Sequence, residues 1–332
     1  MLQEAHARYP PAEVRPRDCR RLMKPRISDL TAILLAIAGF TCWVLADSCI
    51  KWIGQFGVPP WEIVACMGIF MALTLAARGA LRHEMAALRP HSLARQFLRS
   101  LLDLANNICV VIALRHLSLT MFYILVFLSP LVIGVLSPLL LRERVGPLRA
   151  AALVIGFGGV VVAVAPWSHA QHADLAGIAA CMVCVACFSV NMIWSRVLTR
   201  TECPESLAFF SGIVTAVAGL TLCGFHARPL SASLAGLLVA MGICCACGTL
   251  CFYTAVKHTS ASNVSQYHYT QLITGTFVSW LVWHDRPGPT ILMGGGLILG
   301  SGLIIALAAR STPPADKGAV LASASPAPHP LP

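Results

Sequence analysis

Uncharged apolar stretches long enough to cross a lipid bilayer dominate this chain. Residues 117–141 contain no Asp, Glu, Lys or Arg, and residues 145–167 contain only Arg149. A helix that spans a membrane needs about 20 such residues. Charged residues make up 11% of the chain, whereas soluble domains carry about 25%. A water-soluble fold is therefore excluded, and an all-α integral membrane protein is expected.

Ten such stretches are predicted to be transmembrane helices. The basic, Pro- and Arg-rich residues 1–29 are interpreted as a cytoplasmic extension and not as a cleaved signal peptide. Residues 310–332 are mostly Pro, Ala and Ser and are expected to be a disordered tail. The ten predicted spans are 30–51, 61–78, 97–115, 119–141, 147–166, 174–196, 205–225, 233–256, 262–284 and 289–309.

The basic residues predict the orientation of the chain in the membrane. With the N-terminus inside, all but four of the 24 Lys and Arg residues fall on the cytoplasmic side; the exceptions are Lys51, Arg115, Arg228 and Arg286. Both termini are therefore predicted to be cytoplasmic. The net charge of +10 is explained by this distribution in short loops, so nucleic acid is not expected as a partner.

An internal repeat divides the spans into two sets of five. At an offset of 142 residues the motif Glu143–Pro147 meets Asp285–Pro289, with Asp285-Arg286 in place of Glu143-Arg144. Further upstream the offset becomes 145, so that Trp43 meets Phe188 and Lys51 meets Arg196.

The repeat units are predicted to be residues 30–167 and residues 174–309, with five helices each. Because five is odd, the second unit must lie upside down relative to the first. Two inverted five-helix repeats are typical of carriers whose site lies near the midplane.

The sequence resembles the drug/metabolite transporter superfamily, specifically its proteins with two EamA-type repeats. Pro130, the Glu143-Arg144 pair and the glycines of residues 156–159 carry the resemblance in the first repeat, and Tyr269–Leu272 with Asp285 carry it in the second. The resemblance implies a secondary transporter of small metabolites in the bacterial cytoplasmic (inner) membrane. It favours a branch that includes S-adenosylmethionine uptake carriers, so amino-acid-like or nucleoside-like substrates are expected.

One position departs from the family pattern. Family members often carry an Arg five residues after a Glu early in the second span, whereas here Glu62 is followed at that spacing by Met67. The resemblance therefore does not fix the substrate. A flippase for lipids or lipid carriers is the alternative function, and an intramembrane enzyme is a more distant one, because the polar residues are scattered and do not form an acid/base or metal cluster.

Polar and aromatic residues inside the spans are the candidate substrate site, because charges at mid-bilayer cost about 2.5–3.5 kcal/mol and must face a cavity or the protein interior. Asp47 and Lys51 share a helix face and form either a charged patch at the outer mouth or a local ion pair. Asp103 contacts substrate, couples transport to protons, or pairs with Arg99 near the cytoplasmic end of its span. The candidates are Trp43, Asp47, Lys51, Asp103, Asn106, Tyr123, Asn191, Gln266, Tyr267, His268, Tyr269 and Gln271, with Tyr253 as a lesser one.

The start of the ninth span is the most polar run in any span. Gln266, His268 and Tyr269 offer donors, acceptors and an aromatic face, which also attracts cations such as sulfonium or ammonium groups. The alternative is hydrogen bonding between helices.

No cofactor or metal is predicted. The chain has no GxxxxGK[ST] motif, and its 14 cysteines lie mostly in apolar spans, where Cys packs as a small apolar residue. The expected partners are a small-molecule substrate, with proton coupling and a homodimer as options, and the lipid bilayer.

Overall fold

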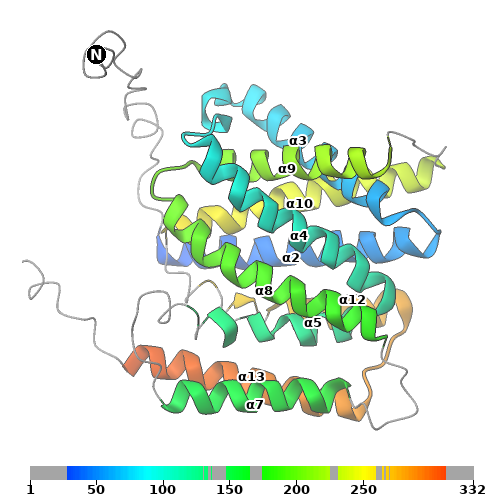
Figure 1. Cartoon of the computed structure of the whole chain (residues 1–332), viewed down its shortest axis with the longest axis vertical. Helices are drawn as coiled ribbons and strands as arrows, with labels where there is room; N and C mark the ends of the chain where they lie inside the picture. Colours follow the sequence, from blue (N-terminus) through cyan, green and yellow to red (C-terminus); the bar gives the residue numbers. More distant parts are fainter. Residues whose placement is uncertain are drawn as a thin grey trace, which may run out of the picture.

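The fold is built from long, closely packed helices that run roughly alongside one another (Figure 1). The computed structural model describes residues 28–129, 131–133, 136, 147–164, 174–224, 231–258, 264, 267–268 and 270–311. No strand occurs among these residues. The helices are α2 (Asp29–Gln55), α3 (Pro60–Leu81), η1 (Met85–Leu88), α4 (Leu93–His116), α5 (Leu119–Val126), α7 (Pro147–Val164), α8 (Leu175–Leu198), α9 (Pro204–Leu222), α10 (Ala232–His258), α12 (Thr270–Trp283) and α13 (Pro289–Ser311).

Proline and capping residues explain where most helices begin. Four helices start at a proline, which lacks the backbone N–H that would have no partner in a first turn. Ser28 and Ser118 cap α2 and α5 by accepting bonds from backbone N–H groups three residues on, at 3.1 and 3.2 Å. Gly57, at a φ of 72°, closes the turn between α2 and α3.

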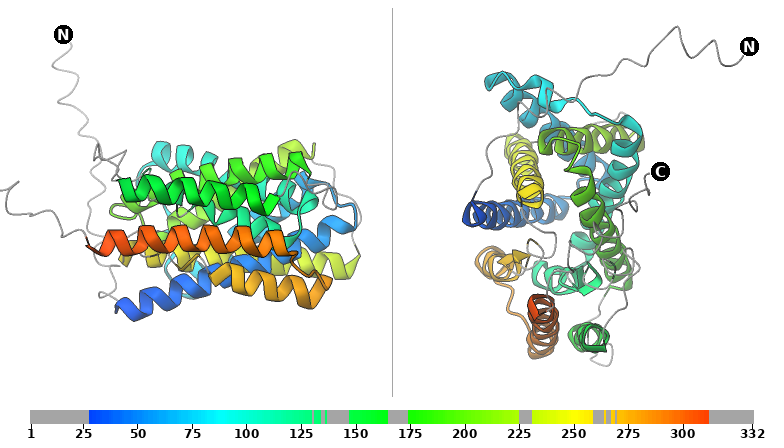
Figure 2. Two further views of the ribbon diagram at one scale, coloured as in Figure 1. Left: turned by 90° about the horizontal axis from the view of Figure 1, so that it is seen from below. Right: turned by 90° about the vertical axis from the view of Figure 1, so that its left-hand side faces the viewer.

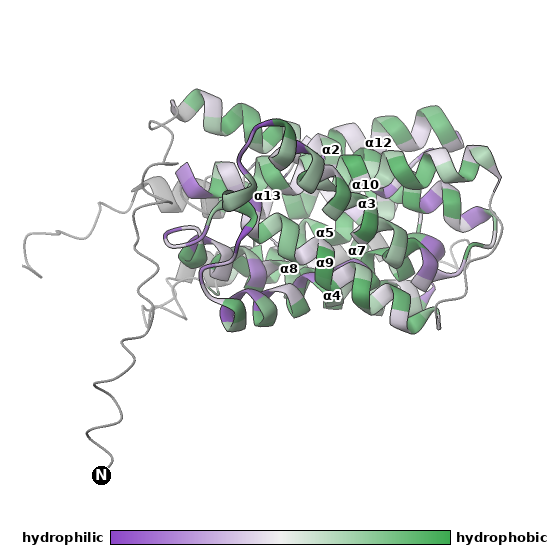
Figure 3. Cartoon of the chain, turned by 90° about the horizontal axis from the view of Figure 1, so that it is seen from above, coloured by the Kyte–Doolittle hydropathy of each residue, from purple (hydrophilic) through white to green (hydrophobic). Residues whose placement is uncertain are grey.

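Six of the described helices are long and apolar enough to cross a membrane: α2 from Leu30, α3, α4, α8, α9 and α10. Many of their outward side chains are large and apolar, as expected where lipid replaces water; Leu34 and Leu73 are 57% exposed. Figure 3 shows the helices coloured mostly as hydrophobic, with the hydrophilic colour concentrated in connecting segments and at helix ends. The chain is therefore a multi-pass, all-helical membrane protein.

The remaining predicted spans are only partly described. Helix α5 ends at Val126, and much of the predicted span 119–141 beyond it lies outside the described residues. Helix α12 begins at Thr270, eight residues later than the predicted span 262–284, and His268 lies in a turn. The predicted extension and tail lie almost wholly outside the described residues, as do Pro130 and the Glu143-Arg144 pair.

The helices pack in four principal pairs. Helix α2 packs on α10, α3 on α9, α4 on α8, and α7 on α13. Figures 1 and 2 show α7 and α13 side by side as an outer layer, with α5 and α12 between that layer and the larger bundle.

Glycines set the closest helix contacts. A Cβ added at Gly68 of α3 would lie 2.2 Å from the backbone nitrogen of Ala216 in α9, and one added at Gly219 would lie 2.4 Å from the nitrogen of Ala65. Only glycine permits this approach, which is typical of membrane helices. The tight α3–α9 pair joins the first half of the chain to the second.

Candidate functional site

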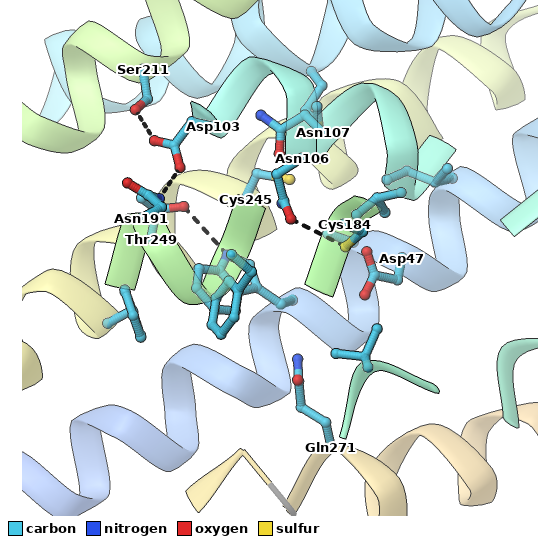
Figure 4. A pocket seen from close by; sticks show the side chains of 18 of the residues that line it. Asp47, Asp103, Asn106, Asn107, Cys184, Asn191, Ser211, Cys245, Thr249 and Gln271 are labelled. Carbon is cyan, nitrogen blue, oxygen red and sulfur yellow. Dashed lines mark hydrogen bonds between the residues drawn. The ribbon is translucent and has the colours of Figure 1, made fainter. Parts of the chain in front are cut away.

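A cavity lies inside the helix bundle, between elements from both halves of the chain (Figure 4). Its volume is about 110 Å³. Eight of the twelve main candidates line it, as does the lesser candidate Tyr253; the eight are Trp43, Asp47, Asp103, Asn106, Tyr123, Asn191, His268 and Gln271. The structure therefore brings together residues that are more than 200 positions apart in the sequence.

Asp103 is the centre of a hydrogen-bond network at one side of the cavity. The Arg99 guanidinium donates to its Oδ2 at 2.6 Å, and the Tyr253 hydroxyl donates to the same oxygen at 3.1 Å. The Ser211 hydroxyl also donates to Oδ2, and the Asn191 amide donates to Oδ1 (Figure 4). These donors belong to α4, α8, α9 and α10, so one carboxylate connects four helices.

Arg99 lies behind Asp103, and none of its side chain is exposed. It donates to the Tyr253 hydroxyl at 2.5 Å, to Ser211 Oγ at 2.6 Å and to the Leu207 carbonyl at 2.8 Å. Arg99, which was counted among the cytoplasmic basic residues, is therefore a buried partner of Asp103 and not an exposed loop charge. Its charge is tolerated because a carboxylate and several oxygen acceptors surround it.

The position of Asp103 along α4 bears on its predicted alternatives. Helix α4 begins at Leu93, four residues earlier than the predicted span. Asp103 is thus ten residues into the helix, about 15 Å from its start at 1.5 Å per residue. The pairing of Asp103 with Arg99 was one of the predicted alternatives, and it is found deep in the bundle.

Asp47 occupies another side of the cavity, away from Asp103 (Figure 4). The Tyr123 hydroxyl donates to its Oδ2 at 2.8 Å. Lys51 instead donates to the Leu117 carbonyl at 2.7 Å and lies 5.8 Å from the centre of the Trp283 ring. The alternative of a local Asp47–Lys51 ion pair is therefore wrong, and Lys51 is not among the residues that line the cavity.

The polar start of the ninth predicted span is only partly described. Gln266 and Tyr269 lie outside the described residues, and Tyr267 is partly buried without lining the cavity. His268 and Gln271 do line it. Within the described part of the chain, His268 Nδ1 and Gln271 Oε1 are buried without a hydrogen-bond partner, although Gln271 Nε2 donates to the Phe40 carbonyl at 3.2 Å. These free positions can bond to a ligand.

An aromatic wall completes the cavity. The Trp43 ring lies 5.0 Å from Phe252 and 6.1 Å from Phe188, and the Phe188 ring lies 5.0 Å from His268 (centroid distances). Trp43 Nε1 donates to Thr249 Oγ1 at 3.3 Å. Phe188 and Phe252 were not among the predicted site residues, although the pairing of Trp43 with Phe188 in the repeat was a signal for the first of them.

Other lining residues are individually inconspicuous in the sequence. Asn107, Ser211, Thr249, Cys184 and Met67 all reach the cavity. The Cys184 thiol donates to Asn106 Oδ1 at 3.1 Å. Met67, the residue at which the sequence departs from the expected family pattern, also lines the cavity.

A second hollow lies at the side of the molecule and differs in chemistry. It is lined almost entirely by apolar residues of α12 and α13, together with Thr120 and Ile124 of α5. Such a lining suits contact with lipid chains. The central cavity, with its two carboxylates and its amide groups, is the better candidate for a polar ligand.

Comparison with known proteins identifies the family. The model described as the EamA-like transporter family matches residues 30–165 and 175–307. The chain belongs to this family. The match occurs twice and covers most of the chain, so the EamA unit is present in two copies.

Named relatives from bacteria are all transporters. The chain is 29% identical over 226 residues to a riboflavin transporter of Rhizobium johnstonii, covering 68% of this chain and 74% of the relative. It is 23% identical over 219 residues to the pseudopaline exporter CntI of Pseudomonas aeruginosa, covering 66% and 77%. It is 25% identical over 183 residues to an S-adenosylmethionine uptake transporter of Rickettsia conorii, covering 54% and 60%.

A solved crystal structure shares the fold. Its chain matches with a TM-score of 0.63 at 21% identity, over 86% of this chain and 100% of its own length. Together with the family match, these findings show that the protein is a multi-pass transporter of small metabolites in the bacterial inner membrane.

Proposed function

We propose that this EamA-like transporter is a secondary carrier that binds its substrate in the central cavity and moves it by alternating access. The observation that supports this most directly is the cavity itself, because both halves of the chain supply its polar lining. A site between two repeats is the arrangement that rocking carriers use. The named relatives support a non-enzymatic role.

The size of the cavity supports a conformational change. Sites for small molecules usually have volumes of about 300–1,000 Å³. The cavity here measures about 110 Å³. A metabolite the size of a nucleoside or a flavin therefore requires the surrounding helices to move apart.

The helix pairs support two inverted five-helix repeats, at residues 30–167 and 174–309. Adding 142 to the bounds of α7 (147–164) gives 289–306, which falls within α13, and adding 142 to those of α4 (93–116) gives 235–258, which falls within α10. In the two repeats α2 corresponds to α8, α3 to α9, α4 to α10 and α7 to α13. If each helix is replaced by its counterpart, the α2–α10 pair becomes the α8–α4 pair, and the α3–α9 and α7–α13 pairs stay the same. This pattern is expected from a two-fold relation between repeats.

Lys51 and Arg196 support the same relation. Lys51 of α2 donates to the carbonyl of Leu117, at the C-terminal end of α4. Arg196 of α8 donates to the carbonyls of Val256 and Lys257, at the C-terminal end of α10. Cations are favourable at helix C-termini, so this matched pair is better explained by packing within each repeat than by contact with substrate.

Several finer features belong to the proposal. Both termini are placed in the cytoplasm, on the distribution of Lys and Arg. The names of the relatives suggest flavin-like, amino-acid-like or S-adenosylmethionine-like substrates. Gln266 and Tyr269 are retained as substrate contacts. Coupling to protons and a homodimeric state stay predictions.

Transport by purified protein in liposomes tests the proposal. The substrate panel would include riboflavin, S-adenosylmethionine, amino acids and nucleosides, with uptake and efflux measured with and without a pH gradient. Gln271→Ala in the cavity should reduce transport by at least tenfold, whereas Gln55→Ala at the exposed end of α2 should not. Folded protein that neither binds nor moves any member of the panel would contradict the proposal.

A further inference from the structure

The two carboxylates of the cavity have different surroundings. Asp103 accepts bonds from Arg99, Tyr253, Ser211 and Asn191, so a cation and three neutral donors compensate its charge. Among the described residues, Asp47 accepts one bond, from the Tyr123 hydroxyl. Within the described part of the chain, no basic side chain forms an ion pair with Asp47.

No lysine or arginine lies among the described residues that line the cavity. Arg99 is fully buried behind Asp103, and Lys51 is turned toward the Leu117 carbonyl. Met67 places an apolar side chain on the wall. Among the described residues, Asp47 is thus a cavity carboxylate that no basic side chain pairs with. A carboxylate held away from water stays ionised at least cost beside a cation, and the open side of Asp47 is available for one.

Aromatic faces lie one helical turn from Asp47. Trp43 is four residues earlier on α2, about 6 Å along the helix, and both residues line the cavity. Phe188 and Phe252 stand against the Trp43 ring from α8 and α10. Such faces stack on planar ligand rings and attract cations.

We propose that the cavity selects organic cations that carry a planar ring, with the positive charge beside Asp47 and the ring against Trp43, Phe188 and Phe252. The proposal rests on the central cavity being the substrate site. Charge and ring are separated by about one helical turn, which a sulfonium or ammonium group joined to a heteroaromatic ring by a short linker can span. Asp103 is a structural carboxylate in this scheme, because Arg99 already satisfies it.

Matched probes that differ in charge test this selectivity. The first pair is tryptamine, whose ammonium group stands two carbons away from its ring, and N-acetyltryptamine, its neutral amide. The second is S-adenosylmethionine, a sulfonium, and S-adenosylhomocysteine, the thioether that lacks the sulfonium charge and has no net charge. Binding to the purified full-length protein would be measured by titration calorimetry. The cation of each pair should bind at least about 30-fold more tightly than the neutral compound, the effect expected for a charge pair shielded from water.

Variants locate the selectivity at Asp47. Asp47→Asn keeps the size of the side chain and its acceptor for Tyr123, and it should remove the preference for cations. Asp47→Glu should retain the preference. Glu205→Gln removes an acidic group that pairs with Arg78 outside the cavity, and it should leave the preference unchanged. Met67→Arg brings a positive charge into the cavity and should abolish the preference for cations, whereas Met67→Gln should preserve it. These two variants test the inference even if Asp47→Asn does not fold.

The outcomes separate this inference from the proposed function. The inference is overturned if the two members of each pair bind equally. It is also overturned if the cation preference persists in Asp47→Asn or Met67→Arg. In either case the carrier proposal still stands if binding depends on Gln271. Absence of all binding by folded protein contradicts both. The inference is supported if, among these variants, only Asp47→Asn and Met67→Arg lose the preference for cations, while the affinity for the neutral compounds stays the same.

Discussion

Breaking the buried pair between Arg99 and Asp103 should destabilise the fold more than any single change at the surface. The guanidinium is fully buried and lies 2.6 Å from the carboxylate, whose side chain is 15% exposed. Arg99→Met preserves most of the side-chain volume and removes the charge. Asp103 is then left as a buried anion without its cation, which costs about 3–5 kcal/mol.

The structure indicates which losses are recovered. The Tyr253 and Ser211 hydroxyls still donate to Asp103, so their bonds persist in the variant. The Leu207 carbonyl loses the bond from Arg99 at 2.8 Å, a further loss of order 1 kcal/mol that relaxation reduces. We therefore expect a total loss of about 3–5 kcal/mol in the free energy of unfolding.

A double-mutant cycle separates the pair from simple packing. Replacing both partners, as Arg99→Met with Asp103→Leu, removes both charges together. The double variant should be more stable than the sum of the single changes predicts by at least about 2 kcal/mol. Unfolding in mixed detergent micelles, followed by the fluorescence of the seven tryptophans, provides the measurement.

A partly exposed ion pair provides the control. Arg78 and Glu205 lie 3.6 Å apart with 28% and 21% of their side chains exposed. Arg78→Met should cost about 1 kcal/mol or less. If Arg99→Met costs no more than Arg78→Met, or if Asp103→Leu brings no recovery in its background, the account of the Arg99–Asp103 pair is wrong.

Three further predictions concern packing and the helix ends. Gly68→Ala should lower the free energy of unfolding by about 1–3 kcal/mol, because its Cβ would lie 2.2 Å from a backbone nitrogen of α9. Gly236→Ala is the control, because a Cβ added there would meet no neighbouring atom within 4 Å. Equal stability of the two variants would contradict the packing argument. Glu202→Gln should reduce the thermal stability of purified protein, because Glu202 accepts two backbone N–H bonds at the start of α4, at 2.8 and 2.9 Å; unchanged stability would argue against this capping role. At the exposed N-terminus of α8, the bond from His116 and the capping N–H of Ala176 lower the pKa of Asp174 from 3.8. The contribution of Asp174 to stability is therefore present above pH 3.8 and is lost as the pH falls through its lower, folded-state pKa. Asp174→Asn should remove this acid-sensitive component from unfolding curves measured over a series of pH values.

The helices that could be predicted well are those whose limits depend on local chemistry. Pro60, Pro204 and Pro289 start helices within one residue of the predicted spans, because proline suits a first turn and apolar length determines the rest. The start of the ninth span is described only at Val264, Tyr267 and His268; Val264 and Tyr267 are helical, His268 lies in a turn, and the continuous helix α12 begins at Thr270. His268 lines the cavity, where irregular backbone is tolerated in a membrane protein.

The candidate site could be predicted from intramembrane polarity but not in its pairings. Asp47 and Asp103 stood out because carboxylates inside a membrane must face something polar. Their different partners depend on contacts across more than 70 residues, such as Tyr123 with Asp47 and Tyr253 with Asp103. The burial of Arg99 could not be predicted, because an arginine near the start of a span has the same pattern whether it faces water or a buried carboxylate.

The two repeats differ at the turn between their first and second helices, and this difference bears on how a rocking carrier would open. In the second repeat that turn carries Glu202, which accepts bonds from the His91 and Ser92 backbone and from Gln96, and so joins α8–α9 to the start of α4. In the first repeat the equivalent position, 145 residues earlier, is Gly57, which has no side chain to form such a link. Under the proposed alternating access, opening the Glu202 end would require several charge-assisted bonds to break, each of order 1.5–3 kcal/mol. Among the described residues, the turn at Gly57 is instead held by a bond from the Arg115 guanidinium to the Val58 carbonyl, which lies within the first repeat. The bonds at Glu202 would thus favour a conformation closed at that end, and a substrate that opens it would have to supply binding energy of comparable size.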